Sequence, residues 1–171
     1  MIRVLNILTD SNIGGAGRLL VNYLRNFDRS EFETAVVLPA GSDLKPCVEE
    51  AGYPVIEIQN GRDKSMDFKA MREVMRIIRD WKPDVLIVRY WMSWFAPSLG
   101  YITRRMKKHC KVISILDNVI PHEPHFFDAP LTRYFLRGSD GCVTLCDAVG
   151  KDLFRLKPDA VHTTIPHPLY S

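Results

Sequence analysis

The chain alternates short apolar runs, rich in Val and Ile, with longer amphipathic stretches, and this alternation constrains the fold more than any other feature. Near-continuous apolar runs are typical of strands that helices cover on both faces. Strands and helices in regular succession build a parallel sheet through right-handed crossovers. The strands are expected at Val4–Thr9, Thr34–Leu38, Val55–Ile58, Val85–Arg89, Lys111–Leu116, Gly141–Leu145 and Ala160–Thr164.

The stretches between these runs repeat apolar residues every three or four positions, as helices packed on a sheet do. In one of them, Asp67 suits an acidic first turn and Lys82-Pro83 ends the pattern. The helices are expected at Gly17–Phe27, Leu44–Ala51, Asp67–Trp81, Ser93–Lys108, Pro130–Arg137 and Ala148–Leu156. The predicted fold is therefore a Rossmann-like, three-layer α/β/α domain with a parallel sheet of about seven strands.

Length and composition indicate an ordinary globular domain. The chain has 171 residues, of which 46% are hydrophobic and 25% charged. A net charge of +3 is far from the concentrated charge of a nucleic-acid binder, so no nucleic acid is expected as a partner. No apolar run reaches the length of a membrane span, and strand-like sequence follows Met1 directly, so neither an anchor nor a secretion signal is expected. The four cysteines form no CxxC pair, which favours free, buried thiols in a reducing, cytoplasmic compartment.

The first expected strand leads through Asp10 into a glycine cluster, Ile13–Arg18, and then into an amphipathic stretch. Glycine allows positive φ angles and a close approach of the backbone to a ligand, and amides at a helix N-terminus favour anions, phosphate above all. In open α/β sheets, ligands bind at the carboxyl ends of the strands, where such turns lie. The cluster therefore indicates one wall of a ligand-binding crevice. The alternative is a tight turn without a ligand.

Two phosphate-binding motifs can be tested against the spacing of this turn. The dinucleotide fingerprint requires a third glycine and an acidic residue after the second strand, but the chain has Leu20 and Leu38-Pro39 there. The P-loop requires Lys and then Ser or Thr after its last glycine, but Gly17 is followed by Arg18-Leu19. Neither motif is present.

A strand, a Gly-Gly-x-x-Arg turn and an amphipathic helix that open a parallel domain resemble the start of retaining glycosyltransferases of the GT-B fold, family 4. Four later segments are similar to motifs of that family, in the same order along the chain. They are Trp81–Leu86 (WKPDVL), Asn118–Glu123 (NVIPHE), Asp147–Leu153 (DAVGKDL) and Ile165–Tyr170 (IPHPLY). The resemblance runs from Met1 to Tyr170 and implies the amino-terminal half of a GT-B fold.

The family implies two Rossmann-like domains that face each other across a cleft, the first holding the acceptor and the second most of the nucleotide-sugar donor. Residues 1–165 would be the acceptor domain and 166–171 the start of the interdomain linker. The expected activity is transfer of a hexosyl group to a glycan or lipid-linked acceptor, as in polysaccharide biosynthesis. A carboxy-terminal donor domain would be the partner, without which the chain is expected to be inactive. The family needs no metal or other cofactor, because positive side chains and backbone dipoles stabilise the leaving diphosphate.

The resemblance also implies roles for single residues. Gly14 and Gly15 would lie near the donor phosphates and the acceptor, joined there by Arg18 and Asn118. The catalytic candidates are Asp117, His122 and Glu123, which cluster near a strand end and could hydrogen-bond an acceptor hydroxyl or act as acid and base. Asp117 stands where one branch of the family has histidine, a departure that bears on catalytic competence and on the acceptor's identity. The alternative for His122 and Glu123 is a bracing role in the loop.

Further acceptor-binding candidates are Asp10 and the run Arg89-Tyr90-Trp91, which follows the fourth expected strand. The aromatic rings there could stack on a sugar or lipid, or could belong to the core. His122, His125 and Asp128 match no standard zinc spacing, so no metal is expected.

The densest basic cluster contains Arg104, Arg105, Lys107 and Lys108. A basic amphipathic helix can lie on an anionic membrane, which suggests peripheral contact with the inner face of the membrane. The alternative is a solvated helix end that the helix dipole favours. Two other functions stay open: a non-catalytic glycan-binding or regulatory module, and one half of a nucleotide-sugar 2-epimerase with the same fold.

Overall fold

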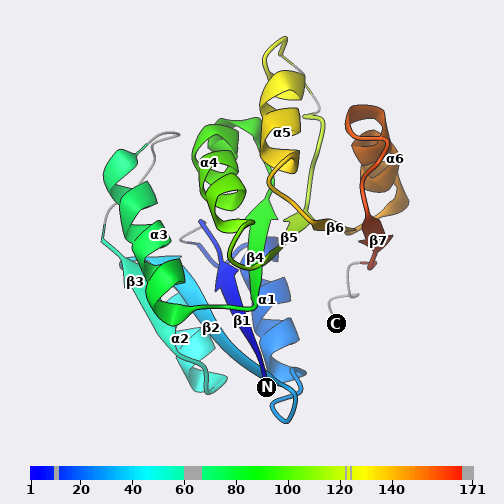
Figure 1. The fold of residues 1–171 in the computed structure, drawn as a ribbon. Coiled ribbons are helices and arrows are strands. Elements are labelled where there is room, and N and C mark those ends of the chain that lie inside the picture. The colour runs from blue at the N-terminus through cyan, green and yellow to red at the C-terminus, as the bar shows by residue number, and fades with distance from the viewer. Residues whose placement is uncertain (10–11, 60–66, 122, 124, 167–171) are drawn as a thin grey trace. The chain divides into compact units, whose positions relative to one another are not determined.

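The computed structural model describes residues 1–9, 12–59, 67–121, 123 and 125–166, where strands and helices alternate as expected (Figure 1). The strands are β1 (Ile2–Ile7), β2 (Phe32–Pro39), β3 (Val55–Ile58), β4 (Val85–Tyr90), β5 (Lys111–Leu116), β6 (Gly141–Thr144) and β7 (His162–Thr164). They form a seven-stranded sheet in the order β3-β2-β1-β4-β5-β6-β7. The pairs β1-β2, β2-β3, β5-β6 and β6-β7 run parallel. The prediction of a Rossmann-like α/β fold is confirmed.

The chain divides into two compact units, one from Met1 to Leu86 and one from Ile87 onward. The division falls inside β4. The sequence predicted one domain over residues 1–165 and a linker that begins at residue 166. Residues 167–171 of that linker lie outside the described part of the chain.

In the first unit, β3, β2 and β1 are covered by α1 (Gly15–Arg25) and α2 (Leu44–Glu50) on one side and by α3 (Phe68–Trp81) on the other (Figure 1). Right-handed crossovers between neighbouring parallel strands place α1 and α2 on the same face. The core on that face includes Leu24, Val36, Leu38 and Leu44, none of them more than 1% exposed. These apolar residues come from β2 and from the two helices beside it, α1 and α2.

Both ends of α3 are fixed by residues that the sequence analysis named. The Asp67 carboxylate accepts hydrogen bonds from the backbone of Lys69 (2.9 Å) and Ala70 (3.1 Å), so Asp67 caps the helix and does not belong to its first turn. Lys82 has a φ of 52° and donates its backbone N–H to the Ile78 carbonyl at 2.9 Å. The left-handed residue and the proline after it end the helix, as predicted.

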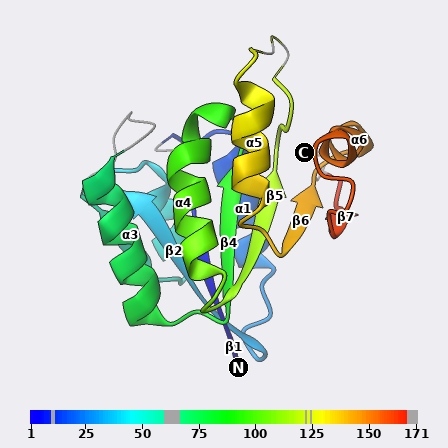
Figure 2. The same cartoon turned by 45° about the horizontal axis from the view of Figure 1, so that its top comes forward.

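In the second unit, parallel strands alternate with one short 3-10 helix and three α-helices. These are η1 (Ser93–Phe95), α4 (Ala96–Met106), α5 (Asp128–Leu136) and α6 (Asp147–Leu156). Helices α4 and α5 lie side by side over β4 and β5 (Figure 2). They approach closely because Gly100 has no side chain: a Cβ there would lie 2.5 Å from the Tyr134 ring. The Arg104 guanidinium lies over the Tyr134 ring, 4.9 Å from the ring centroid.

The starts of three helices differ from the sequence prediction by two or three residues. Helix α1 begins at Gly15, two residues before the expected start, so that Gly15 and Ala16 belong to the helix. The expected helix from Ser93 to Lys108 is a 3-10 turn followed by α4, with Pro97 at the start of α4. Helix α5 begins at Asp128, so that Pro130 occupies its first turn. A proline fits there because the first N–H groups of a helix have no intrahelical partner.

The structure also bears on the cysteines and on membrane-spanning segments. All four cysteines are free thiols, as predicted, but only Cys110 and Cys142 are buried; Cys47 is half-buried and Cys146 is exposed. In the described part of the chain, no helix is both long and apolar enough to cross a membrane.

Candidate functional site

The glycine turn ends at the N-terminus of α1 in an extended, not left-handed, backbone. Gly14 is the N-cap, with φ −89° and ψ −170°, and the glycines with positive φ in the described ranges are Gly41 and Gly52. A Cβ added at Gly15 would meet no atom within 4 Å. Gly15 therefore leaves open space beside the helix end, which serves close approach of a ligand and not an unusual backbone angle.

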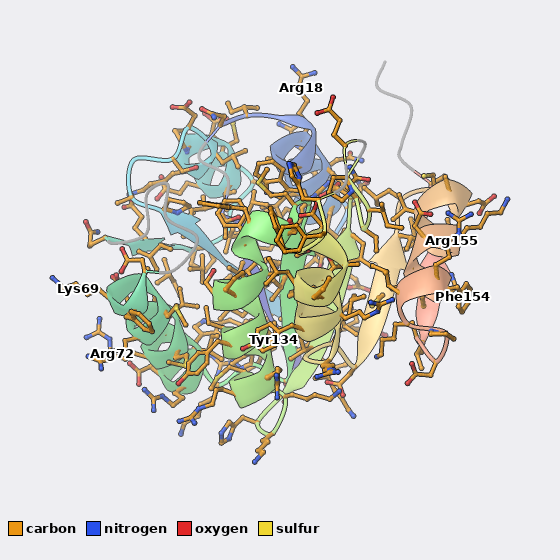
Figure 3. The ribbon with its side chains drawn as sticks, turned by 90° about the horizontal axis from the view of Figure 1, so that it is seen from above. Arg18, Lys69, Arg72, Tyr134, Phe154 and Arg155 are labelled. Atoms are coloured by element: carbon orange, nitrogen blue, oxygen red, sulfur yellow. The ribbon has the colours of Figure 1, made fainter. Side chains whose placement is uncertain are left out.

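Arg18 lies in the first turn of the same helix, where a cation is unfavourable for the helix itself. The first turn contains no acidic residue. The Arg18 side chain is exposed and points outward (Figure 3). Among the described residues it forms no ion pair. The positive end of the helix dipole and a guanidinium thus lie together, an arrangement that suits a bound anion. Asp10 lies outside the described residues.

In the second unit, Arg89 near the end of β4 pairs with Asp117, which follows β5. Arg89 Nε donates to Asp117 Oδ2 at 2.6 Å, and Arg89 Nη2 donates to Asp117 Oδ1. The Arg89 side chain is 6% exposed and the Asp117 side chain 24%. Asp117 also donates its backbone N–H to the Tyr90 carbonyl at 3.0 Å. The two-point pair fixes the carboxylate and balances its charge.

This pairing joins two residues that the sequence analysis treated separately. It gives Arg89 the role of holding Asp117 in position. Asp117 keeps some exposure, so a hydroxyl can reach it, although both of its carboxylate oxygens already accept hydrogen bonds from Arg89.

Tyr90 and Trp91 have different surroundings although they are adjacent. Tyr90 is 1% exposed, its hydroxyl is 2.7 Å from Thr132 Oγ1, and its ring stacks on Phe135 at 4.3 Å. Burial raises the pKa of Tyr90 to about 12. Trp91 is 39% exposed and its ring lies 5.6 Å from Phe95. Tyr90 therefore belongs to the core, whereas the Trp91 ring is exposed to solvent.

The loop after β5 carries the remaining catalytic candidates. Asn118 is half-buried, next to the buried Val119, and Glu123 is exposed. His122 lies outside the described residues. Within the described ranges, no group of three His, Cys, Asp or Glu side chains could hold a metal ion.

Asp128 is a buried residue that the sequence analysis considered only for a metal site. It is 4% exposed and accepts hydrogen bonds from Ser93 Oγ and, at 2.6 Å, from the His125 backbone. Burial disfavours its charge, but the hydrogen bonds from Ser93 and His125 outweigh this effect and hold the pKa of Asp128 below its ordinary value. Asp128 thus ties η1 to the start of α5. The sequence signal for this role was the position of Asp128 at the start of a helix whose first turn contains Pro130.

Several aromatic rings are exposed in the turn after β4 and in the loop before α5. Trp94 is 57% exposed, Phe126 93% and Phe127 40%. The Phe127 ring stacks on His125 at 5.1 Å. Exposed aromatic rings of this size can contact an apolar ligand face.

The basic cluster at the end of α4 is largely engaged within its own unit. Lys107 Nζ donates to the Ser139 carbonyl at 3.2 Å and lies 3.5 Å from Asp140 Oδ1. Arg105 lies over the Tyr101 ring at 5.8 Å, as Arg104 lies over Tyr134. Lys108 is exposed.

Comparisons with known proteins identify both a family and a fold. Residues 14–168 match the family model described as glycosyl transferase 4-like domain. A search of curated proteins gave no match. HepE from Anabaena, solved with UDP and glucose, has a TM-score of 0.76 and 13% identity over 99% of this chain and 45% of its own.

Two further solved structures are similar. A glycosyltransferase from Rickettsia africae has a TM-score of 0.72 and 14% identity over 96% of this chain and 42% of its own. The UDP-GlcNAc 2-epimerase from Neisseria meningitidis, solved with UDP-GlcNAc, has a TM-score of 0.65 and 12% identity over 90% of this chain and 43% of its own. This chain spans less than half the length of each of these structures.

Proposed function

The chain belongs to the glycosyl transferase 4-like domain family, and from this membership we propose that it is the amino-terminal, acceptor-binding half of a retaining glycosyltransferase. In this proposal a nucleotide-sugar donor supplies a hexosyl group to a glycan or lipid-linked acceptor. A carboxy-terminal donor domain holds most of the donor and is required for transfer. The chain alone is inactive.

The observation that carries the proposal is the position of Arg18 at the N-terminus of α1, beside the open space at Gly15. A diphosphate leaving group gains negative charge as the bond to the sugar breaks. The helix dipole and the guanidinium are fixed before the reaction and favour that charge, which is the form of electrostatic stabilisation that lowers a barrier most effectively. Gly14 adds backbone at the same place.

On the acceptor side, the proposal assigns hydrogen bonding of an acceptor hydroxyl to Asp117, with Arg89 holding the carboxylate in position. Trp91 offers an exposed ring for a sugar face. Asn118, His122 and Glu123 stay proposed catalytic or binding residues of the same loop. Asp10 stays a proposed acceptor-binding residue, whereas Tyr90 is buried and can act only by positioning its neighbours.

The remaining parts of the proposal concern chemistry and location. The transfer uses no metal or organic cofactor, because the positive groups above supply the charge stabilisation. The protein works in the cytoplasm, at the inner face of a membrane when its acceptor is lipid-linked. The cluster Arg104, Arg105, Lys107 and Lys108 is one candidate for that peripheral contact.

A second candidate function is an epimerase half, favoured by the similarity in fold to the Neisseria UDP-GlcNAc 2-epimerase. The two functions differ in what they consume. A transferase needs an acceptor, whereas an epimerase changes a nucleotide sugar alone.

Calorimetry of the 171-residue chain against glycan acceptors and UDP-sugars is the first test. Binding of an acceptor without measurable binding of UDP-sugar is the expected result. Binding of a glycan that persists in a two-domain form without transfer would favour a non-catalytic module. Conversion of UDP-sugar by the two-domain form without an acceptor would favour the epimerase.

Substitutions in α1 test the proposed anion site in the chain joined to a donor domain of its family. Arg18→Gln and Gly15→Val are expected to lower transfer at least about tenfold, since one charged contact to an anion contributes roughly 1.5–3 kcal/mol. Arg25→Gln is the matched control, because it removes the same charge from the exposed far end of the same helix. Equal rates for Arg18→Gln and Arg25→Gln would contradict the assignment. Loss of the circular dichroism signal in Gly15→Val would make that glycine purely structural.

A further inference from the structure

Helix α3 carries four cations at intervals of three, four and three residues, which places them on one face. All four side chains are exposed, and Lys69 and Arg72 point away from the helix into solvent (Figure 3). The opposite side of α3 is buried against the first unit through Ala70, Met71, Val74 and Ile78. The cations form what is called here the α3 basic face: Lys69, Arg72, Arg76 and Arg79.

Helix α3 keeps a net positive charge, since its four cations stand against two acidic residues, Glu73 and the exposed Asp80. Within the described parts of the chain, none of the four cations forms an ion pair, and Arg79 Nε donates to the carbonyl of Met75 at 3.3 Å. The one glutamate of α3, Glu73, accepts instead from the Gln59 backbone at 3.1 Å. At 1.5 Å per residue the four cations extend over about 15 Å. The basic cluster at the end of α4 differs, because Lys107 is paired there with Asp140.

An exposed aromatic side chain lies at the end of this face. Phe68 is 64% exposed and opens the helix. The spacing of four residues to Arg72 and of eleven to Arg79 puts it on the same side of the helix as these cations. Cations with long apolar stems beside an exposed ring suit the boundary between lipid headgroups and acyl chains, where the ring enters and the charges reach phosphates. A polynucleotide would offer the ring no apolar layer, and the face has no repeated aromatics on which bases could stack.

We propose that the α3 basic face, together with Phe68, docks the protein on an anionic lipid bilayer. The face is already presented by a folded helix, so docking requires no unfolding of the first unit. This inference is independent of the proposed sugar transfer, although it would bring a lipid-linked acceptor within reach.

Co-sedimentation of the chain with lipid vesicles tests the proposal. The wild-type chain is expected to bind vesicles of phosphatidylcholine and phosphatidylglycerol and not vesicles of phosphatidylcholine alone. Each cation near an anionic surface strengthens binding about fivefold, so replacing all four by Gln is expected to weaken binding by at least about 100-fold. Phe68→Ser is expected to weaken the binding that remains at high salt, where charge attraction is screened.

The matched control removes four exposed charges of the second unit that belong to no proposed site, by replacing Lys111, Arg133, Arg137 and Lys151 with Gln. Its loss of vesicle binding is expected to be at least about tenfold smaller, because both variants change the net charge equally and only one changes the docking face. Equal losses, or a larger loss in the control, would overturn the proposal. Equal binding to neutral vesicles, or preferential binding to a polynucleotide over anionic vesicles, would overturn it as well. Circular dichroism spectra of the variants that match the wild-type spectrum would exclude unfolding as the cause of weaker vesicle binding.

Discussion

At the scale of single residues, the pairing of Arg89 with Asp117 is the contact that most affects the proposed site. A guanidinium that is 6% exposed depends on a fixed counter-charge, and Asp117 supplies it through both oxygens. The same contact limits the chemistry of Asp117, because both of its carboxylate oxygens already accept hydrogen bonds from Arg89. Positioning of a hydroxyl therefore fits this residue better than proton abstraction.

Asp117→Asn is expected to lower the free energy of unfolding by about 1–3 kcal/mol, since it weakens two charged hydrogen bonds of a buried group. Urea denaturation at neutral pH measures the change. The double variant Arg89→Met with Asp117→Leu is expected to lose less than the single changes together, because it leaves no buried charge. A midpoint for Asp117→Asn equal to that of the wild type would show that the pair does not hold the fold.

Asp128, the first residue of α5, has a structural role and makes the stability of the fold depend on pH. The pKa of Asp128 is below its ordinary value in the folded chain, so ionised Asp128 stabilises the fold. This contribution is fully present above the ordinary pKa of 3.8 and is lost as the pH falls through the lower, folded-state value.

Asp128→Asn is therefore expected to lose about 1–3 kcal/mol at pH 7 and to show a flatter decline of stability in acid than the wild type. Urea midpoints measured from neutral pH down to about pH 3 check both effects. Asp159→Asn, an exposed change after α6, serves as the control and should stay within about 0.5 kcal/mol. A steeper acid decline in Asp128→Asn would reverse the assigned sign.

At the scale of elements, the contact between α1 and α2 depends on a glycine whose role differs from that of its neighbours. A Cβ at Gly17 would lie 2.9 Å from Leu44 Cδ1, inside the distance of normal contact. Leu44 is fully buried and has little room to move. One glycine of the cluster thus serves packing, while Gly15 faces open space.

Gly17→Ala is expected to destabilise the chain by about 1–3 kcal/mol through overpacking. Gly15→Ala, two residues away in the same helix, is expected to leave stability unchanged or slightly higher, because alanine favours helix and meets no atom. Thermal or urea unfolding of the two variants provides the comparison. Equal effects would mean that Leu44 can move aside.

The helices also show which features the apolar pattern of the sequence could not predict. Apolar periodicity located every strand and helix, because burial on a sheet imposes it. It did not separate η1 from α4, since a 3-10 turn and an α-helix bury similar positions. Nor did it give the start of α1 at Gly15, because glycine counts against a helix in any propensity argument.

At the scale of the whole molecule, the four free thiols report on folding because their surroundings differ. Cys146 is exposed and Cys47 half-buried, whereas Cys110 and Cys142 are buried. Burial raises the pKa of Cys110 to about 11, with the charge of Asp140 adding to the effect. Burial likewise raises the pKa of Cys142 to about 11.

A disulfide reagent at mildly alkaline pH is therefore expected to modify Cys146 first, Cys47 more slowly, and the other two only as the chain unfolds. The thiolate is the reactive form, and a raised pKa keeps it rare in the buried pair. Stopped-flow absorbance with and without urea measures the phases, and Cys146→Ser should remove the fastest one. Four thiols reacting at one rate in the folded chain would contradict the burial of Cys110 and Cys142.

Much of the candidate site lay within reach of the sequence, but its internal contacts did not. The turn at Gly14 and Gly15, the carboxylate at Asp117 and the ring of Trp91 follow directly from strand ends, which patterns locate well. The pairing of Arg89 with Asp117 joins residues 28 positions apart, and the role of Asp128 depends on Ser93 across 35 positions. No local pattern contains such separations.

The sequence by itself determined the succession of strands and helices, the Rossmann-like class and the family. Burial against a sheet requires apolar residues at regular spacing, and the motifs of the family are short, continuous segments. Only the tertiary structure decided what each polar or aromatic side chain does there. It buried Tyr90, exposed Phe126, fixed Asp117 on Arg89 and gathered four cations on the free side of α3. Exposure and pairing depend on packing between distant segments, and that information becomes available only when the segments are in contact.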